Sequence, residues 1–360
     1  MSGMSFTSSL FGLAGLIAAA ACSSASAQTV LQQPVTIPLA LLKVGASERL
    51  AIPASIGDSG ITGNYLLDTG SSPFVSAYTK GAPWWGSQFS PTGETRVIHY
   101  VETGFQFSSV LTRVTVGSGN KSVSSSPDFP VNQAVIRLVK RADAWVEDPR
   151  WKEALEAAIK DGVPPEARHF YGTMGADLGN SSVGLFRLVL DATGSQGPLV
   201  AGFAIEGLGS HPELTIGLTP EMKNRFPIQI PINKAEGNLA QKVIAAEFSL
   251  EYRGQRYPLG RAGVVLDTGA PRTAINTAEG FEVPPTLVAE NGLLRRGVAL
   301  HMRCGDLAWT HVAGPGHQIA VRKAAGPEGG VNSGIRFFHY FNVMFDVQNG
   351  IVGFAPVRQP

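Results

Sequence analysis

The sequence predicts an all-β protein, and three observations support this fold class. Short apolar or alternating runs recur between turns rich in Gly, Pro, Asn and Ser, as in TRVIHYV at 95–101 and FNVMFDV at 341–347. The chain has 42 Gly and 24 Pro among 360 residues and is 44% hydrophobic, which fits a turn-rich protein with a substantial core. Only one segment carries a strong helix signal.

Strand-like runs continue through the chain after residue 28. Further examples are VTIPLAL at 35–41, SSVLTRVTV at 108–116, GLFRLVL at 184–190, ELTIGL at 213–218 and AEFSLEY at 246–252. We expect DATG at 191–194 to be a hairpin turn that follows the 184–190 strand.

The exception is EDPRWKEALEAAIKDG at 147–162, which predicts a helical insertion in the first half of the chain. Asp148 can cap this helix and Gly162 can end it. Trp151, Leu155 and Ile159 form an apolar stripe, which we interpret as a packing face.

The N-terminus resembles an export signal. Residues 10–21, LFGLAGLIAAAA, form a short apolar region, and Ala25-Ser26-Ala27 provides a cleavage site before Gln28. We therefore expect a signal peptide over 1–27 and a periplasmic or secreted protein. The alternative is a lipoprotein anchored to the membrane through Cys22, which follows Ala19-Ala20-Ala21.

Composition excludes several function classes. With 29 basic and 28 acidic residues the formal net charge is +1, so no electrostatic footprint for nucleic acid is present. No later stretch has the length of a transmembrane helix. The two cysteines, Cys22 and Cys304, leave the mature domain without an internal disulfide, and we expect a monomer held by its core.

The most informative feature is a repeated Asp-Thr-Gly. NYLLDTGSSPFV occupies 64–75 and AGVVLDTGAPRTAI occupies 262–275, so Asp68 and Asp267 each follow an apolar run, 199 residues apart. By chance about 0.06 copies of this triplet are expected in such a length. One copy per half of the chain indicates an internal repeat.

Two carboxylates held at strand ends by glycine turns have a definite chemistry when they face each other. They cannot both ionise cheaply, so they share one proton. The aspartic-protease pair is the standard example of this principle. The ionised carboxylate can then take a proton from water while its protonated partner polarises a carbonyl oxygen, and Thr69 and Thr268 can link the two loops by hydrogen bonds.

These motifs resemble those of pepsin-like aspartic peptidases. DTGSS at 68–72 matches the first active-site motif, and IHYVETG at 98–104 is similar to the flap, the hairpin that covers the cleft. The other similar segments are YGTMG at 171–175, ELTIG at 213–217 and GIRFFHYFNVMFDVQNGIVGFAP at 334–356.

The resemblance implies two β-barrel-like lobes related by a pseudo-twofold axis, with an extended polypeptide bound in the cleft between them. The N-terminal lobe would span 28–225 and the C-terminal lobe 226–360. Asp68 and Asp267 would be catalytic and no cofactor or metal is implied. Supporting positions would be Thr69, Gly70, Ser71, Thr268 and Gly269, and the flap would contribute Tyr100, Thr103 and Gly104.

The sequence departs from the family pattern at three places near the expected site. Ala270 stands where relatives place a Ser or Thr that donates to the aspartate, so we expect activity at less acidic pH. Val75 replaces a Trp that supports the flap tyrosine. Asn332 and Ser333 are polar where the family is apolar, which predicts an irregular crossing segment.

The sequence thus predicts an exported aspartic endopeptidase, with a catalytically silent pepsin-fold binding or inhibitory protein as the alternative. His301, Cys304, His311 and His317 have no ligand-pair spacing, so no metal site is expected. Trp84 and Trp85 could either line the cleft or pack under the first lobe.

Overall fold

The computed structural model describes most of the chain after the expected signal peptide, namely residues 30–99, 103–142, 144–178, 182–232, 244–324 and 327–357. The signal peptide over 1–27 and Cys22 lie outside the described residues. Within the described ranges, no helix combines the length and the apolarity that crossing a bilayer requires.

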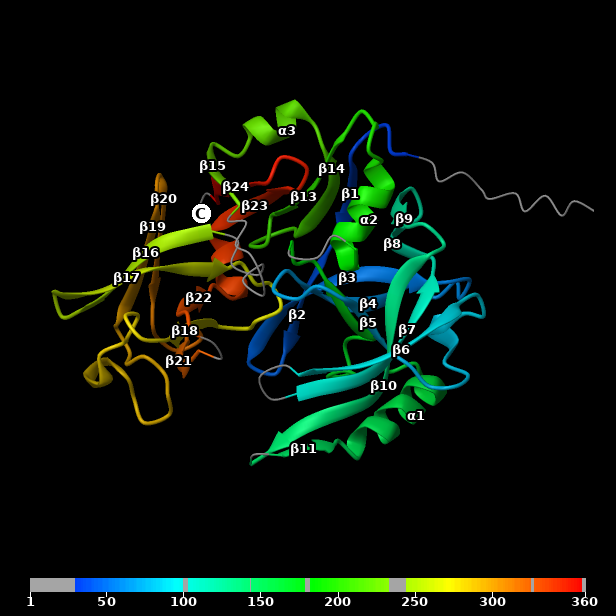
Figure 1. The fold of residues 1–360 in the computed structure, drawn as a ribbon, viewed down its shortest axis with the longest axis horizontal. Coiled ribbons are helices and arrows are strands. Elements are labelled where there is room, and N and C mark those ends of the chain that lie inside the picture. The colour runs from blue at the N-terminus through cyan, green and yellow to red at the C-terminus, as the bar shows by residue number, and fades with distance from the viewer. Residues whose placement is uncertain are drawn as a thin grey trace, which may run out of the picture.

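A large sheet occupies the first half of the chain, on the right in Figure 1. Its main path runs β6-β7-β10-β5-β12-β4-β3-β8-β9, with β11 paired to β10 and β2 paired to β3. The strands are β2 (Ala40–Val44), β3 (Ser47–Ile56), β4 (Gly63–Asp68), β5 (Phe74–Ala77), β6 (Ser90–His99), β7 (Thr103–Thr112), β8 (Val114–Ser118), β9 (Lys121–Ser124), β10 (Phe129–Arg141), β11 (Ala144–Glu147) and β12 (Gly172–Gly175).

A second sheet occupies the second half, on the left in Figure 1, in the order β20-β19-β16-β17-β22-β18-β21. Its strands show the alternation expected of a sheet with one buried face, most clearly in β20, where Leu307, Trp309 and His311 are buried and their neighbours are exposed. The strands are β16 (Ile244–Tyr252), β17 (Gln255–Val265), β18 (Thr273–Thr277), β19 (Ala299–Cys304), β20 (Leu307–Val312), β21 (Ile319–Lys323) and β22 (Gly330–Asn332).

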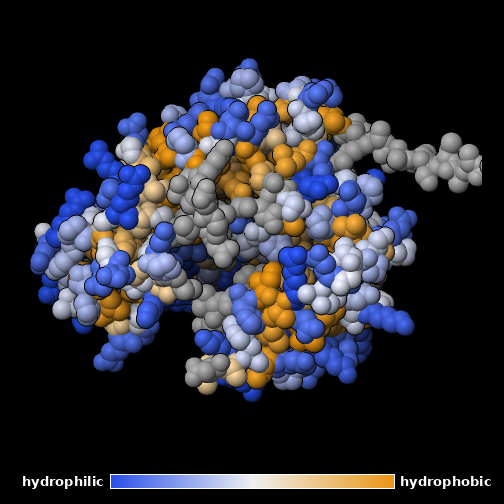
Figure 2. All heavy atoms as spheres, in the orientation of Figure 1, coloured by the Kyte–Doolittle hydropathy of each residue, from blue (hydrophilic) through white to orange (hydrophobic). Residues whose placement is uncertain are grey.

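A third sheet joins the two halves, at the top of Figure 1, in the order β1-β14-β13-β23-β24-β15. Its centre is the antiparallel pair β13–β23, where Phe203 lies opposite Phe345 and the two buried rings stack 4.8 Å apart. The strands are β1 (Val35–Pro38), β13 (Val200–Glu206), β14 (Glu213–Leu218), β15 (Ile228–Pro231), β23 (Phe341–Asp346) and β24 (Ile351–Pro356). The surface is hollowed between the two lobes (Figure 2).

The helices are few and short. They are α1 (Arg150–Asp161), α2 (Gly184–Thr193), α3 (Pro220–Asn224) and the 3₁₀ turns η1 (Pro83–Trp85), η3 (Pro285–Leu287) and η4 (Ile335–His339). The predicted insertion is α1: Asp148 accepts the Arg150 N–H, and Trp151 packs edge-on against Phe105 of β7. Of the expected packing stripe, Ile159 is 43% exposed.

The prediction of a strand at 184–190 with a hairpin turn after it was wrong, because these residues form α2. Leu185, Leu188, Val189 and Ala192 are all buried, and their spacing places them on one face of a helix. The run is apolar enough to fit the hydrophobic periodicity of either a strand or a helix. Its packing against β13 favours the helix.

The two halves repeat one local arrangement around the Asp-Thr-Gly loops. In the first half β12 runs parallel to β4 and antiparallel to β5. In the second half β22 runs parallel to β17 and antiparallel to β18. The crossing segment at Asn332 is therefore a regular strand paired on both sides, and the expectation of irregularity was wrong. Its polar side chain takes part in the site described next.

Candidate active site

Both aspartates leave the sheets at the point where a central strand ends. Asp68 is the last residue of β4, and its backbone carbonyl accepts the N–H of Ala176 at 2.8 Å. Asp267 follows β17 by two residues, and its backbone N–H donates to the Ser333 hydroxyl at 3.3 Å. Each crossing segment therefore holds the backbone of the aspartate in front of it.

Thr69 and Thr268 lock the two loops together. The Thr69 hydroxyl donates to the Leu266 carbonyl and the Thr268 hydroxyl donates to the Leu67 carbonyl, both at 2.6 Å. Each threonine oxygen also accepts the other's backbone N–H, at 3.1 and 3.0 Å. Both side chains are buried, so this reciprocal set fixes one half of the molecule against the other.

The glycines of the two motifs let the carboxyls approach each other. A Cβ added at Gly70 would lie 2.5 Å from the carboxyl carbon of Asp267. A Cβ at Gly269 would in the same way overlap the carboxyl carbon of Asp68. Each aspartate therefore reaches across to the opposite loop, and only glycine leaves room for it.

The two carboxyls receive different donors. The Gly70 N–H donates to Asp68 Oδ1 at 2.9 Å, and the Ala270 N–H donates to Asp267 Oδ1 at 2.8 Å. Asp267 also accepts a side-chain bond, from Asn332 Nδ2 to Oδ2 at 2.5 Å. The absence of a hydroxyl at Ala270 therefore does not leave Asp267 without a side-chain donor.

Ser71 is the corresponding side-chain group beside Asp68. Its buried hydroxyl favours the ionised form of Asp68, although among the described residues it has no partner at ordinary hydrogen-bond geometry. At this geometry Ser71 is a weaker donor than the Asn332 amide.

Burial and then repulsion from Asp267 raise the pKa of Asp68 well above its usual range, against the opposing effect of the Ser71 and Gly70 donors. Asp68 keeps some contact with solvent, yet protein atoms surround its carboxyl and exclude most water. This raised pKa favours a pair that shares one proton, and the titration of the pair depends on both coupled carboxyls.

Comparison with known proteins supports the fold. A scan against models of known protein families and a search of curated proteins both found no match. Among solved structures, the aspartic proteinase from Irpex lacteus matches with a TM-score of 0.59 and 18% identity, covering 91% of this chain and 98% of that one. The chain has a pepsin-like fold. The predicted all-β, two-lobed architecture is thereby confirmed.

In this pepsin-like fold, the segment predicted to be the flap is a hairpin of β6 and β7. Gly104 lies opposite His99, and Thr103 pairs with Val139 of β10. The His99 ring stacks on Trp145 of β11 with centroids 4.1 Å apart. Tyr100, at the expected tip, lies outside the described residues.

Under the first lobe of the pepsin-like fold, both tryptophans of GAPWWG are packing residues. The Nε1 groups of Trp84 and Trp85 donate to the Ala77 carbonyl at 2.8 and 2.7 Å, and both side chains are almost fully buried. Val75 in β5 is also buried. Of the two interpretations of the tryptophans, packing under the lobe is the correct one.

Near the aspartate pair lies a positive charge, and nothing in the sequence indicated this charge. Arg49 of β3 is half-buried and interacts electrostatically with Asp267 and Asp68. Burial lowers the pKa of Arg49, and repulsion from Arg272 adds to this effect, whereas the two aspartates oppose it. In the sequence Arg49 is an ordinary strand residue, and no local pattern could have placed it beside the site.

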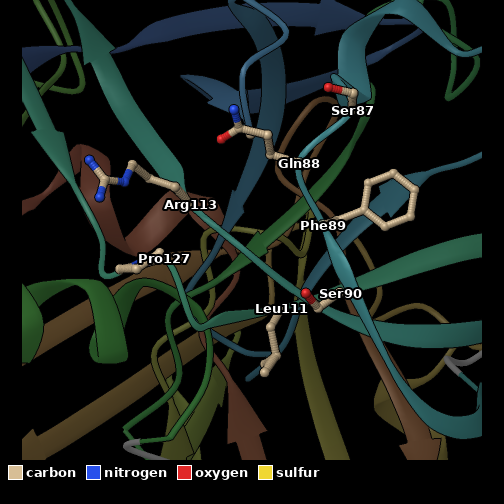
Figure 3. A pocket seen from close by; sticks show the side chains of 8 residues that line it. Ser87, Gln88, Phe89, Ser90, Leu111, Arg113 and Pro127 are labelled. Carbon is tan, nitrogen blue, oxygen red and sulfur yellow. The ribbon is translucent and has the colours of Figure 1, made fainter. Parts of the chain in front are cut away.

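One pocket lies elsewhere, on the first lobe, with a volume of about 580 Å³. Figure 3 shows the side chains around it, and its lining contains neither aspartate: Gly57, Ser87, Gln88, Phe89, Ser90, Leu111, Arg113 and Pro127. A smaller pocket of about 330 Å³ includes Pro271 of the second Asp-Thr-Gly loop together with Glu48 and Arg336, so it adjoins the site and touches both lobes. Across the described residues, no group of three or more His, Cys, Asp or Glu side chains could hold a metal ion.

Proposed function

We propose that the protein is an aspartic endopeptidase that hydrolyses extended polypeptides with a water molecule activated by Asp68 and Asp267. The observation that carries this proposal is the facing pair of carboxyls, held across two loops by the reciprocal threonine bonds and by glycines without room for a side chain. Two half-neutralised acids in a water-accessible hollow can supply both a base and an acid.

The reaction needs one proton on the pair at the start. The ionised carboxylate accepts a proton from water as the oxygen attacks the peptide carbonyl carbon, and the protonated partner donates its proton to the carbonyl oxygen. A tetrahedral diol forms without a covalent link to the enzyme. The protonated carboxyl then donates its proton to the amide nitrogen while the ionised carboxylate takes a proton from one diol hydroxyl. The C–N bond breaks, a carboxylic acid and an amine leave, and the pair again holds one proton.

Substrate would enter the hollow between the lobes as an extended chain. The β6–β7 hairpin would cover it, with Thr103 and Gly104, at the end of the hairpin where Gly104 pairs with His99, as substrate-contacting positions. Tyr100, which the sequence places in the flap between these strands, would be a third such position. A denatured protein is therefore a better substrate than a folded one, because only an extended segment can lie along the groove.

The decisive experiment is digestion of a denatured protein at several pH values, with and without pepstatin. We expect cleavage in the wild type that is lost in both Asp68→Asn and Asp267→Asn. Because asparagine keeps the side-chain shape, circular dichroism should show unchanged folds. No cleavage by the wild type at any pH would overturn the proposal.

The alternative is a pepsin-fold binding or inhibitory protein without catalysis. Its support is the pair of departures around the site, Val75 in β5 and the Asn332 amide on Asp267 Oδ2, where the family has other side chains. Tight binding of a partner protein by a chain that cleaves nothing would favour it.

We further propose that the protein is exported, with the signal peptide at 1–27 removed, and that it is a monomer with its lobe boundary near residue 225. Cleavage after Ala27 and lipidation of Cys22 predict different masses for the mature N-terminus. Mass spectrometry of purified protein therefore separates a secreted or periplasmic protein from a membrane-anchored lipoprotein.

A further inference from the structure

Asn332 is held so that its amide group has only one possible orientation. Its Oδ1 accepts the backbone N–H of Gly334 at 2.9 Å, which leaves the NH₂ group to face Asp267 Oδ2 at 2.5 Å. Gly334 packs closely against the Arg272 backbone, since a Cβ there would lie 2.6 Å from it, and its φ of +62° favours glycine. The donor on Asp267 is thus fixed by its surroundings.

The two halves of the molecule differ at this point. By strand register, Asn332 lies opposite Val265, two residues before Asp267, and its counterpart in the first half is Thr173, opposite Leu66. No described hydrogen bond joins Thr173 to Asp68. The first half instead has the Ser71 hydroxyl in its loop, where the second half has Ala270.

The donors therefore favour different protonation states for the two acids. Both carboxyl oxygens of Asp267 accept an N–H, one from Ala270 and one from Asn332. Because an N–H donor needs an acceptor, these two bonds favour the ionised form of Asp267. On Asp68 the described N–H donor, Gly70, reaches Oδ1, so Oδ2 is free of such a donor and can carry the proton. Asp68 can then donate that proton toward Asp267.

We propose that Asn332 is a positioning residue that keeps the negative charge of the pair on Asp267 and the shared proton on Asp68. It takes over the role of the hydroxyl that is missing at Ala270. This inference rests on the proposed peptidase function for its catalytic meaning: Asp267 would be the base that takes a proton from water, and Asp68 the acid that protonates the carbonyl oxygen.

Other charges around the pair do not replace this contact. Asp68 and Asp267 face each other, and Arg49 of β3 interacts with both of them, with Arg272 nearby. Arg49 favours the negative charge of the pair as a whole without a described contact to one oxygen. Among the residues that the structure describes, Asn332 distinguishes Asp267 from Asp68 by a short side-chain hydrogen bond of 2.5 Å, whereas Ser71 Oγ beside Asp68 has no partner at hydrogen-bond geometry.

The test is a carboxyl titration that needs no substrate. In protein labelled with ¹³C at the aspartate carboxyl carbons, NMR follows both acids, and Asp68→Asn and Asp267→Asn assign the signals. In Asn332→Leu, which has a similar volume and no donor, we expect the first ionisation of the pair to occur about one pH unit higher. In this variant the negative charge, which lies on Asp267 in the wild type, should be divided between Asp68 and Asp267.

Two further variants make the result specific. Asn332→Asp keeps an acceptor for the Gly334 N–H and should preserve the turn. It places a second negative charge beside Asp267, so the pH of the first ionisation of the pair should rise further than in Asn332→Leu. Ala270→Thr combined with Asn332→Leu restores a donor by another route and should return the titration toward that of the wild type. Ala270→Thr alone should change little, because Asn332 is already present.

The pH–rate profile is the second readout. Its acidic limb should move by the same amount as the titration, so kcat/KM at pH values below that limb should fall about tenfold in Asn332→Leu. An unshifted titration in both Asn332 variants, or no recovery in the double variant, would overturn the inference. If the wild type cleaves nothing while the titration shifts as expected, the peptidase proposal fails and the role of Asn332 in fixing the charge stands.

Discussion

At the scale of single residues, the site depends on small differences between two nearly identical loops. Asp68 and Asp267 sit in the same triplet, yet one carboxyl is flanked by Ser71 and the other by Ala270 and Asn332. The sequence was sufficient to predict the pair and the threonine link, because both follow from a repeated local motif. The function of Asn332 was not predictable, since its contact with Asp267 joins positions 65 residues apart.

Asp68 should also leave a signature in the pH dependence of stability. Burial and repulsion from Asp267 raise the pKa of Asp68 in the folded protein above the ordinary value of 3.8. At pH values between the ordinary pKa and the raised one, the folded protein keeps a proton that the unfolded chain has lost. The contribution of Asp68 therefore destabilises the fold as pH rises through this window. We expect Asp68→Asn to match the wild type below about pH 4 and to be more stable at pH 7, as measured by urea unfolding.

The matched control is Asp58→Asn on the same lobe. Hydrogen bonds from the Ser87 side chain and backbone and from the Gln88 backbone lower the pKa of Asp58, so its stabilising effect is present at neutral pH and is lost as pH falls. This substitution should therefore act in the opposite direction at pH 7. Equal pH dependence in Asp68→Asn and the wild type would contradict the raised pKa.

At the scale of elements, the sequence pattern predicted strands well and misassigned α2. The run GLFRLVL satisfies both a buried strand and a buried helix, and only its neighbours determine which forms. Gly184, the first residue of the run, meets such neighbours: its φ is +63°, and a Cβ there would run into the backbone carbonyls of Ser72 and Gly175. The start of α2 is thus packed directly behind the first Asp-Thr-Gly loop.

We therefore predict that Gly184→Ala disturbs the site through this packing. The variant should lose about 3 kcal/mol of unfolding free energy, combining the left-handed backbone with the backbone overlap. Peptidase activity should fall with it, because the backbone of Ser72 and Gly175, next to the Asp68 loop, must shift. Gly162→Ala is the control: its φ is +66° in the left-handed region, but no atom lies within 4 Å of an added Cβ, so only about 1 kcal/mol should be lost. Equal losses in the two variants would contradict a role for the overlap.

At the scale of the whole molecule, three sets of contacts between described residues join the lobes. The third sheet pairs β13 with β23, the threonines link the two loops, and Glu48 of β3 reaches across to η4. Glu48 lies 3.0 Å from His339 and 3.9 Å from Arg336, beside the small pocket that touches both lobes. The two-lobed arrangement was predictable from the repeat. The Glu48 contact was not, because charged residues in a strand and a distant turn carry no shared local pattern.

Burial lowers the pKa of His339, and Glu48 opposes this by favouring the protonated ring. Glu48→Gln removes that opposition and leaves Arg336, whose side chain is 22% exposed, without its described carboxylate partner. We expect the variant to lose about 1 kcal/mol at pH 7, since the pair is partly screened by solvent. The loss should grow as pH falls below the ordinary histidine pKa of 6.5, because the unfolded chain then binds a proton that the folded variant accepts less readily than the wild type does.

Unfolding in urea at pH 7 and pH 5.5, followed by tryptophan fluorescence, measures both effects. Glu94→Gln is the control, because its partner Arg96 is 66% exposed and such surface pairs contribute little. A single transition should persist in Glu48→Gln, since the third sheet still crosses between the halves and unfolds with both. Two separate transitions would show instead that the Glu48 contact, rather than the shared sheet, makes the lobes unfold together.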